Sequence, residues 1–305
     1  MPLSSLDLAS PSQVIAAFEA GASANLSAQC RRGSIDHITG PGQLIATGDL
    51  HDHPVNFRAI VRLAGMEGQP DAGTAGPHAT FHELIHSDKL IDGMDMSYRV
   101  LCRVAALKAA FPQRVHALLA NHEIAQVHGQ GVSKNGVNCV KAFNAGVEYV
   151  FGSEAARVDE AIRGFIASMP LALRCTPSAG GRDVLCAHSL PGSDALDRFD
   201  PSVLERALTD GDFTPRLGSA HLMVWGRGQS DQELQTLADR WGVSLFLLGH
   251  ESAPEGVARL GTRALILNSD HDRGVCCRVG LERELSQSDA LAQIVPLGTV
   301  LGDPW

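Results

Sequence analysis

Four separated segments of the chain carry side chains that commonly bind metal ions, and each segment follows a run of apolar residues. The first supplies Asp49 and His51, the second Asn121, the third His188 and the fourth His250. In an extended segment, residues i and i+2 project to the same side, so Asp49 and His51 can address one ion. Functional side chains in α/β sheets gather at the carboxyl ends of strands. The pattern therefore predicts a metal site built from carboxylate, amide and imidazole ligands at four strand ends.

The apolar runs before these residues predict buried strands, several of which are almost continuously apolar, as is typical of strands covered on both faces. We expect strands at 43–47, 78–81, 115–120, 183–187, 221–225, 244–248, 263–268 and 275–279. Amphipathic patterns predict helices near 11–21, 54–66, 96–111, 138–150, 154–168, 201–209 and 230–241. Asp52 is placed to cap the helix that begins near Pro54. This alternation predicts an α/β protein, with no linker long or polar enough to separate two domains.

Composition excludes several classes of protein. Hydrophobic residues make up 44% of the chain and charged residues 19%, which is typical of a globular protein with a large core. No apolar run approaches the roughly 18 residues of a membrane helix, and the N-terminal sequence lacks the pattern of a secretory signal. The net charge of −9 argues against a nucleic-acid partner. We therefore expect a cytoplasmic protein with no membrane partner, whose oligomeric state the sequence leaves open.

The segments that carry these side chains, taken together, resemble the motifs of the calcineurin-like metallophosphoesterases, in particular the phosphoprotein (serine/threonine) phosphatase branch. The family's Gly-Asp-x-His motif is matched by residues 48–51 and its Asn-His-Glu by residues 121–123. Its later lone histidines are matched by His188 and His250. Further matches are Trp225 to Gly228, similar to a family segment that carries a phosphate-binding arginine, and Asn268 to His271, similar in place to a Ser-Ala-Pro-Asn segment.

The resemblance covers most of the chain, about residues 43 to 280, and implies a four-layer αββα sandwich with two mixed sheets flanked by helices. We therefore expect a single metallophosphoesterase domain over residues 1–305. Within it, residues 1–40 are expected to form an N-terminal helical extension, residues 43–280 the catalytic core and residues 281–305 a C-terminal tail. Loops 65–77 and 129–140 are expected to set substrate specificity.

The family's second motif, Gly-Asp-x-x-Asp-Arg-Gly, is the one from which this chain departs most. Its best match is the segment 82–88, in which Glu83 takes the place of an aspartate that bridges two metals. His86 then replaces the aspartate that orients the catalytic histidine, and Ser87 replaces a phosphate-binding arginine. Asp88 or Asp92 is the alternative bridging ligand. On this alignment His82 needs no catalytic role.

The resemblance implies two divalent ions, for which these ligands suit manganese, iron or zinc. Asp49, His51 and the bridging Glu83 would hold the first ion, and the second would be held by Glu83, Asn121, His188 and His250. The implied reaction is attack on phosphorus by a hydroxide that bridges the two metals.

The implied general acid is His122, which follows Asn121 directly and would protonate the leaving oxygen. Asp88 or Glu123 could serve as its acidic partner, and helix capping is the alternative role of Glu123. Arg227 is the expected phosphate-binding cation, and Arg99 and Arg273 are weaker candidates. Other residues expected to line the substrate site are Asn121, His86 and His271, while His53 is expected to orient neighbouring groups or lie in a loop.

The function implied is a metal-dependent phosphatase acting on phosphomonoesters, with phosphoserine or phosphothreonine in proteins as the substrate class of this branch. One alternative is a nucleotide-directed phosphoesterase of the diadenosine tetraphosphatase type. Another, motivated by the altered second motif, is a degenerate member that binds metal or phosphoprotein without turnover.

Overall fold

The computed structural model describes residues 6–68, 73, 75–129, 131–134 and 136–301. The remaining positions fall in both expected terminal segments and in the two expected specificity loops 65–77 and 129–140. Predictions on residues 1–5, 69–72, 74, 130, 135 and 302–305 therefore lie outside the described residues.

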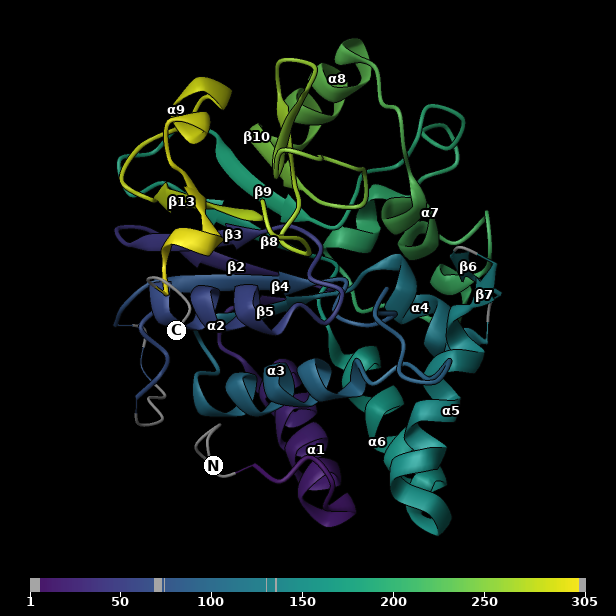
Figure 1. The fold of residues 1–305 in the computed structure, drawn as a ribbon. Helices are drawn as coiled ribbons and strands as arrows, with labels where there is room; N and C mark the ends of the chain where they lie inside the picture. The colour runs from purple at the N-terminus through teal and green to yellow at the C-terminus, as the bar shows by residue number, and fades with distance from the viewer. Residues whose placement is uncertain (1–5, 69–72, 74, 130, 135, 302–305) are drawn as a thin grey trace.

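Two mixed β-sheets lie face to face at the centre of the fold (Figure 1). The order across the first is β14 (Ile294–Pro296), β13 (Val275–Gly280), β3 (Gln43–Thr47), β4 (His78–His82) and β5 (Val115–Leu118). The order across the second is β1 (Arg31–Arg32), β2 (Ile35–Thr39), β8 (Ala172–Thr176), β9 (Asp183–Ala187), β10 (Val243–Leu248), β12 (Ala264–Leu267) and β11 (Val257–Leu260). A small hairpin pairs β6 (Ser133–Lys134) with β7 (Val137–Asn138).

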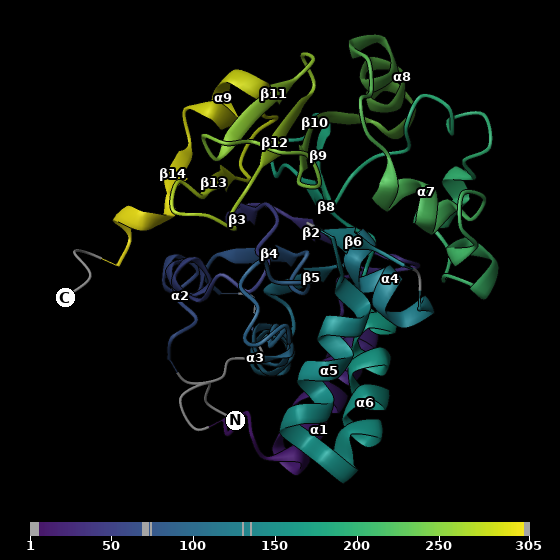
Figure 2. The same cartoon turned by 45° about the vertical axis from the view of Figure 1, so that its right-hand side comes forward.

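Helices cover the outer faces of both sheets, which makes the fold an α/β sandwich of the expected class. On the side of the five-stranded sheet lie α1 (Pro11–Ser27), α2 (Pro54–Leu63), α3 (Tyr98–Ala110), α4 (Asn121–His128), α5 (Cys139–Phe151) and α6 (Ala155–Ser168) (Figures 1 and 2). On the side of the seven-stranded sheet lie α7 (Ser219–Trp225) and α8 (Asp231–Trp241), and α9 (Gln287–Leu291) packs near β13. No helix in the described part of the chain is long and apolar enough to cross a membrane.

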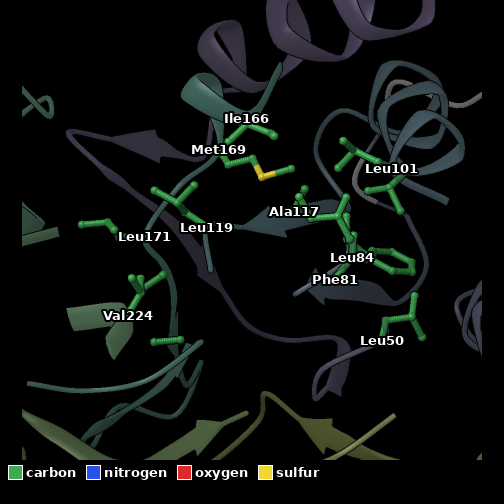
Figure 3. Packing of buried hydrophobic residues seen from close by; sticks show 14 of the residues in the cluster. Leu50, Phe81, Leu84, Leu101, Ala117, Leu119, Ile166, Met169, Leu171 and Val224 are labelled. Carbon is green, nitrogen blue, oxygen red and sulfur yellow. The ribbon is translucent and has the colours of Figure 1, made fainter. Parts of the chain in front are cut away.

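Successive side chains of a strand point to opposite faces of the sheet, and this alternation divides the hydrophobic core into two parts. Leu245 and Leu247 of β10 pack between the sheets, whereas Phe246 joins the larger core under the helices. Figure 3 shows part of that larger core, in which Phe81 of β4 lies near Leu101 of α3. Because both faces of the central strands are buried, their sequences are largely apolar. The position of each strand end is thus fixed by packing on two sides.

Most of the expected strands and helices are confirmed, and three local expectations are wrong. The segment 221–225, expected to be a strand, lies in the helix α7. The helix expected over 201–209 is only a short 3-10 turn, η3 (Pro201–Leu204). His53, and not Asp52, caps α2, because its side chain accepts a hydrogen bond from the backbone N–H of Asn56. The segment 1–40, besides α1, contributes β2 to the seven-stranded sheet, where it pairs with β8.

Candidate metal centre

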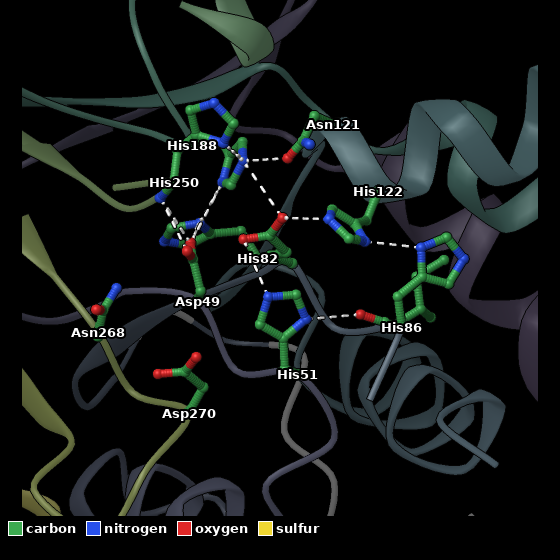
Figure 4. Close-up of polar contacts among 12 residues, drawn as sticks. Asp49, His51, His82, His86, Asn121, His122, His188, His250, Asn268 and Asp270 are labelled. Carbon is green, nitrogen blue, oxygen red and sulfur yellow. Dashed lines mark hydrogen bonds and ion pairs between the residues drawn. The ribbon is translucent and has the colours of Figure 1, made fainter. Parts of the chain in front are cut away.

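Five strands, three from one sheet and two from the other, are followed by polar side chains, several of which Figure 4 shows close together. β3, β4 and β5 are parallel neighbours in the five-stranded sheet, and they are followed by Asp49, Glu83 and Asn121. β9 and β10 are parallel neighbours in the seven-stranded sheet, and they are followed by His188 and His250. The expected convergence of polar groups at strand ends is therefore present, at the seam between the two sheets.

One group of side chains consists of Asp49, His51 and Glu83, whose ligand atoms all lie within 4.8 Å of one another. His51 Nε2 lies 3.5 Å from Glu83 Oε2. The other ring nitrogen, Nδ1, donates a hydrogen bond to the carbonyl oxygen of Ile85 at 2.9 Å. That bond leaves the lone pair on Nε2, the atom that faces the carboxylate. His51 is thus oriented to bind a cation.

A second group contains Glu83 again, with His188 and His250, and it satisfies the same 4.8 Å criterion. His188 Nε2 lies 3.0 Å from His250 Nδ1, 2.7 Å from Asn121 Oδ1 and 3.7 Å from Glu83 Oε1. Donor atoms bound to one ion at about 2.1 Å lie roughly 3 to 3.5 Å from each other. Four potential ligands therefore converge with suitable spacing, and Glu83 is shared by both groups.

His82 belongs to the same cluster, although the sequence alignment gave it no role. Its Nε2 donates to the carbonyl oxygen of Thr47 at 2.7 Å, so its Nδ1 carries a lone pair. That atom lies 3.3 Å from His188 Nδ1, which also faces Asp49 Oδ1 at 3.4 Å. With its proton on Nδ1, His188 presents the lone pair of Nε2 to the convergence point. A hydrogen bond from the ring nitrogen that does not bind the metal is a common means of orienting a metal-ligating histidine.

The charges at the centre suit a cation. Burial, the largest single effect, disfavours the charged form of Asp49, but the hydrogen bond and charge of His188, together with the contacts to Glu83 and His82, outweigh it and hold the pKa of Asp49 well below the usual range. Burial and the neighbouring Asp49 carboxylate raise the pKa of Glu83 well above the usual range. Two buried carboxylates this close require a shared proton or a positive ion. The nitrogen and oxygen donors without a thiolate fit manganese, iron or zinc.

Four of the seven described non-glycine residues with a positive φ lie in or beside the candidate centre. His51, Glu83, His86 and His250 have φ values of 40°, 46°, 63° and 68°, in the left-handed region that side chains rarely adopt. Conformations of this kind cost about 1 to 3 kcal/mol each and cluster at functional sites. The sequence contained no signal for this strain, because none of the four positions is a glycine or an asparagine.

Glu123 positions the loop that carries Glu83 and does not contact His122 in any described interaction. Its Oε1 accepts hydrogen bonds from the backbone N–H groups of Leu84 at 2.8 Å and Ile85 at 3.4 Å. Burial raises its pKa to about 7. The expectation that Glu123 pairs with His122 is therefore wrong. The alternative role at the start of the helix is supported, because Glu123 lies in the first turn of α4 and its carboxylate also accepts a hydrogen bond from its own backbone N–H.

Replacement of Glu123 tests this positioning role. Glu123→Ala leaves the two amide groups without their acceptor, and we expect it to lower the free energy of unfolding by about 2 kcal/mol. Metal affinity should fall by about tenfold, because the loop orients Glu83. Glu123→Gln retains an acceptor oxygen and should stay close to the wild type in both measurements. Thermal unfolding and metal titration followed by calorimetry give the two quantities, and equal behaviour of the two variants would contradict this role.

His122 lies beside the two groups of ligands without belonging to either. Its Nε2 is 3.5 Å from Glu83 Oε1, and its Nδ1 is 2.7 Å from His86 Nδ1. The Asp88 carboxylate accepts instead from Lys134 at 2.8 Å and is half exposed, while Asp92 is exposed. Neither alternative bridge contacts the described cluster, and Asp88 does not contact His122.

Among the expected substrate-binding residues, Arg227 is brought to the cluster and His271 is not. Arg227 donates from Nε to His250 Nε2 at 3.0 Å. His271 holds its own loop, because its Nδ1 accepts from the backbone N–H of Arg273 and its Nε2 faces the carbonyl oxygen of Ala253. The weaker candidates lie elsewhere: Arg273 pairs with Glu255 at the surface, and Arg99 lies against the ring of Tyr98.

The fold resembles those of solved protein phosphatases. A protein serine/threonine phosphatase from Saccharomyces cerevisiae, with similarity to human phosphatase PP5, superimposes with a TM-score of 0.65 at 15% identity, covering 94% of this chain and 88% of that one. The chain has the calcineurin-like phosphoesterase fold. A cold-active protein-tyrosine phosphatase of a psychrophilic Shewanella species gives a TM-score of 0.56 at 14% identity, covering 85% of this chain and 81% of that one. No protein-family model and no curated protein matches the sequence.

The resemblance inferred from the motifs is thus confirmed for the fold. At such low identity the calcineurin-like phosphoesterase fold alone is shared, so the roles of individual residues rest on the geometry of this chain. That geometry places all six expected metal ligands, Asp49, His51, Glu83, Asn121, His188 and His250, in one cluster.

Proposed function

We propose that the chain is a metal-dependent phosphatase that hydrolyses phosphomonoesters. The observation that carries the proposal is that two groups of potential ligands share Glu83, so that one carboxylate is placed between two cation positions. The fold shared with two protein phosphatases supports the same reaction class. Phosphorylated proteins are the proposed substrates, since both of those structures are of protein phosphatases.

In this proposal each side chain has a defined task. Asp49, His51 and Glu83 hold one ion, while Glu83, Asn121, His188 and His250 hold the other. When bound, the ions would activate water as the nucleophile and offset the charge of the phosphoryl oxygens. The Arg227 guanidinium, already at the edge of the cluster through its contact with His250, binds a phosphoryl oxygen. His122 gives the proton on Nε2 to the leaving oxygen.

The leaving group has space beside the cluster. A cavity of about 510 Å³ is lined by Trp225 and Gly226, which directly precede Arg227, and by Arg198, Arg216 and His221 among others. The Trp225 ring also makes an edge contact with the ring of His250, at 6.3 Å between centroids. We propose that this cavity receives the part of the substrate that carries the phosphate.

Metal loading and a substrate panel test the proposed function. Protein stripped with a chelator should be inactive and should regain hydrolysis of p-nitrophenyl phosphate with Mn²⁺, Fe²⁺ or Zn²⁺, at about two ions per chain by elemental analysis. Peptides with phosphoserine, phosphothreonine or phosphotyrosine should be cleaved faster than diadenosine tetraphosphate. The reverse preference would favour a nucleotide-directed enzyme. Two bound metals without turnover of any phosphoester would identify a non-catalytic metal-binding protein instead.

A further inference from the structure

The ring of His122 is held from the side opposite to the candidate metal ligands. Its Nε2 faces Glu83 Oε1 at 3.5 Å, whereas its Nδ1 meets His86 Nδ1 at 2.7 Å (Figure 4). Both rings are buried and make an edge contact at 4.8 Å between centroids. The place that an acidic side chain was expected to take beside His122 is therefore taken by a second imidazole.

Gln126 determines the direction of the hydrogen bonds that link it to His86 and link His86 to His122. Gln126 Nε2 donates to Asn144 Oδ1 at 2.7 Å, which turns Gln126 Oε1 toward His86 Nε2 at 3.2 Å. A carbonyl oxygen only accepts, so the proton of His86 lies on Nε2 and the lone pair on Nδ1. His122 must then donate from its own Nδ1. Its Nε2 is left free for the substrate side.

His86 is itself fixed by its surroundings. Its backbone N–H donates to Ser97 Oγ at 3.1 Å, and that hydroxyl donates to Asp95 Oδ2 at 2.9 Å. Its ring makes an edge contact with Phe143 at 6.0 Å between centroids. Burial lowers the pKa of His86 to about 4, so the ring is neutral near pH 7. A neutral, immobile imidazole is an acceptor that does not bring a charge into the site.

We propose that His86, supported by Gln126, is a positioning residue that holds His122 with its proton on Nδ1 and aims His122 Nε2 at the leaving oxygen. The proposal rests on the proposed phosphatase function. The step begins with His122 protonated on both ring nitrogens, after Nε2 has taken up a proton from solvent. As the bond from phosphorus to the leaving oxygen breaks and the bond from phosphorus to the attacking hydroxide forms, the Nε2 proton moves to the leaving oxygen. His122 ends the step neutral and keeps its Nδ1 hydrogen bond to His86.

The leaving group provides a test that separates positioning from structural damage. Phenyl phosphate has a basic leaving oxygen that needs a proton, whereas the leaving oxygen of p-nitrophenyl phosphate departs with little help. His86→Ala should lower kcat for phenyl phosphate by about 10²-fold, within the range of general acid catalysis, and that for p-nitrophenyl phosphate by less than about tenfold. KM and the metal content should not change. His86→Asp restores an acceptor for His122 Nδ1 and should recover most of the loss, and Gln126→Leu should give an intermediate loss of the same kind.

His128→Ala is the matched control, because His128 lies on the same helix as His122 and stacks on Phe213 away from the cluster. It should leave both substrates unaffected. Equal losses for the two substrates in His86→Ala would overturn the proposal, as would a failure of His86→Asp to recover activity. A third metal ion per chain that is lost in His86→Ala would also overturn it, by making His86 a ligand together with Cys139, whose sulfur lies in the same cluster.

Nitrogen NMR of the imidazole rings in metal-free protein gives a readout that needs no turnover. The spectra should show His122 protonated on Nδ1 and His86 on Nε2, and Gln126→Leu should change the tautomer populations of His86. If the wild type has these tautomers but hydrolyses no phosphoester, the proposed function fails while the hydrogen-bond chain stands. If it is an active phosphatase with His122 protonated on Nε2 alone, the positioning proposal fails while the function stands.

Discussion

Asp49→Asn is expected to lower kcat/KM for p-nitrophenyl phosphate by about 10³-fold or more, which corresponds to about 4 kcal/mol of lost transition-state stabilisation. The substitution removes one of the two buried carboxylates that would offset the metal charge. The fold should survive, because the asparagine oxygen can still accept the hydrogen bond that the backbone N–H of His250 donates to Asp49 at 2.9 Å. Elemental analysis should show fewer than two ions per chain, and steady-state kinetics with Mn²⁺ in excess gives the rate.

Asp52→Asn is the control for this substitution, because it makes the same chemical change three residues away. Burial raises the pKa of Asp52 to about 7, so its carboxylate is partly protonated near neutral pH and its loss should change little. Metal content and activity should therefore remain near those of the wild type. Hydrolysis at the wild-type rate by Asp49→Asn would rule out the two-metal proposal.

Gly249→Ala is expected to remove metal binding and activity together, with a loss of at least about 10²-fold in kcat/KM. A methyl group at this position would lie 2.1 Å from Asp49 Oδ1 and 2.6 Å from His82 Cε1. The Asp49 carboxylate has little freedom to move aside, because the backbone N–H of His250 holds both of its oxygens at 2.9 Å. The unfolding temperature should fall by several degrees, in line with about 1 to 3 kcal/mol for overpacking.

The effect of Gly249→Ala can be compared with the same substitution in a place where space is available. Gly164 lies in α6, and a methyl group there would meet no atom within 4 Å. Gly164→Ala should therefore raise stability by about 0.5 to 1 kcal/mol, because alanine favours the helix, and should leave catalysis unchanged. Thermal unfolding followed by circular dichroism distinguishes the two, and a Gly249→Ala protein with full metal content would contradict the close approach.

The strands that carry the candidate ligands were predictable because both of their faces are buried. β3, β5, β9 and β10 are nearly unbroken apolar runs, and each is followed by the polar residue that was assigned as a ligand. The segment 221–225 shows the limit of this signal, because it is also a short apolar run but lies in α7. Periodicity does not separate a buried strand from a buried helix over five residues.

Several features of the candidate centre could not be predicted, because they depend on contacts between distant segments. The bond between His86 and Gln126 joins residues 40 positions apart, and that between His82 and His188 joins residues 106 apart. The role of Glu123 depends on the turn after β4, where Glu83 adopts a positive φ. The choice of Glu83 as the bridge followed from its place directly after a strand, and the structure puts it between both groups of ligands.

The left-handed backbone at His51, Glu83, His86 and His250 has a consequence for how this sequence can evolve. Random mutagenesis followed by selection for heat resistance alone would favour glycine at these positions, where it relieves the unfavourable φ. Each such replacement would delete a side chain of the cluster. Selection for thermal stability and selection for the function of the site therefore act in opposite directions at these four positions. A descendant of the chain selected for stability alone would keep both sheets but lose side chains of the candidate site.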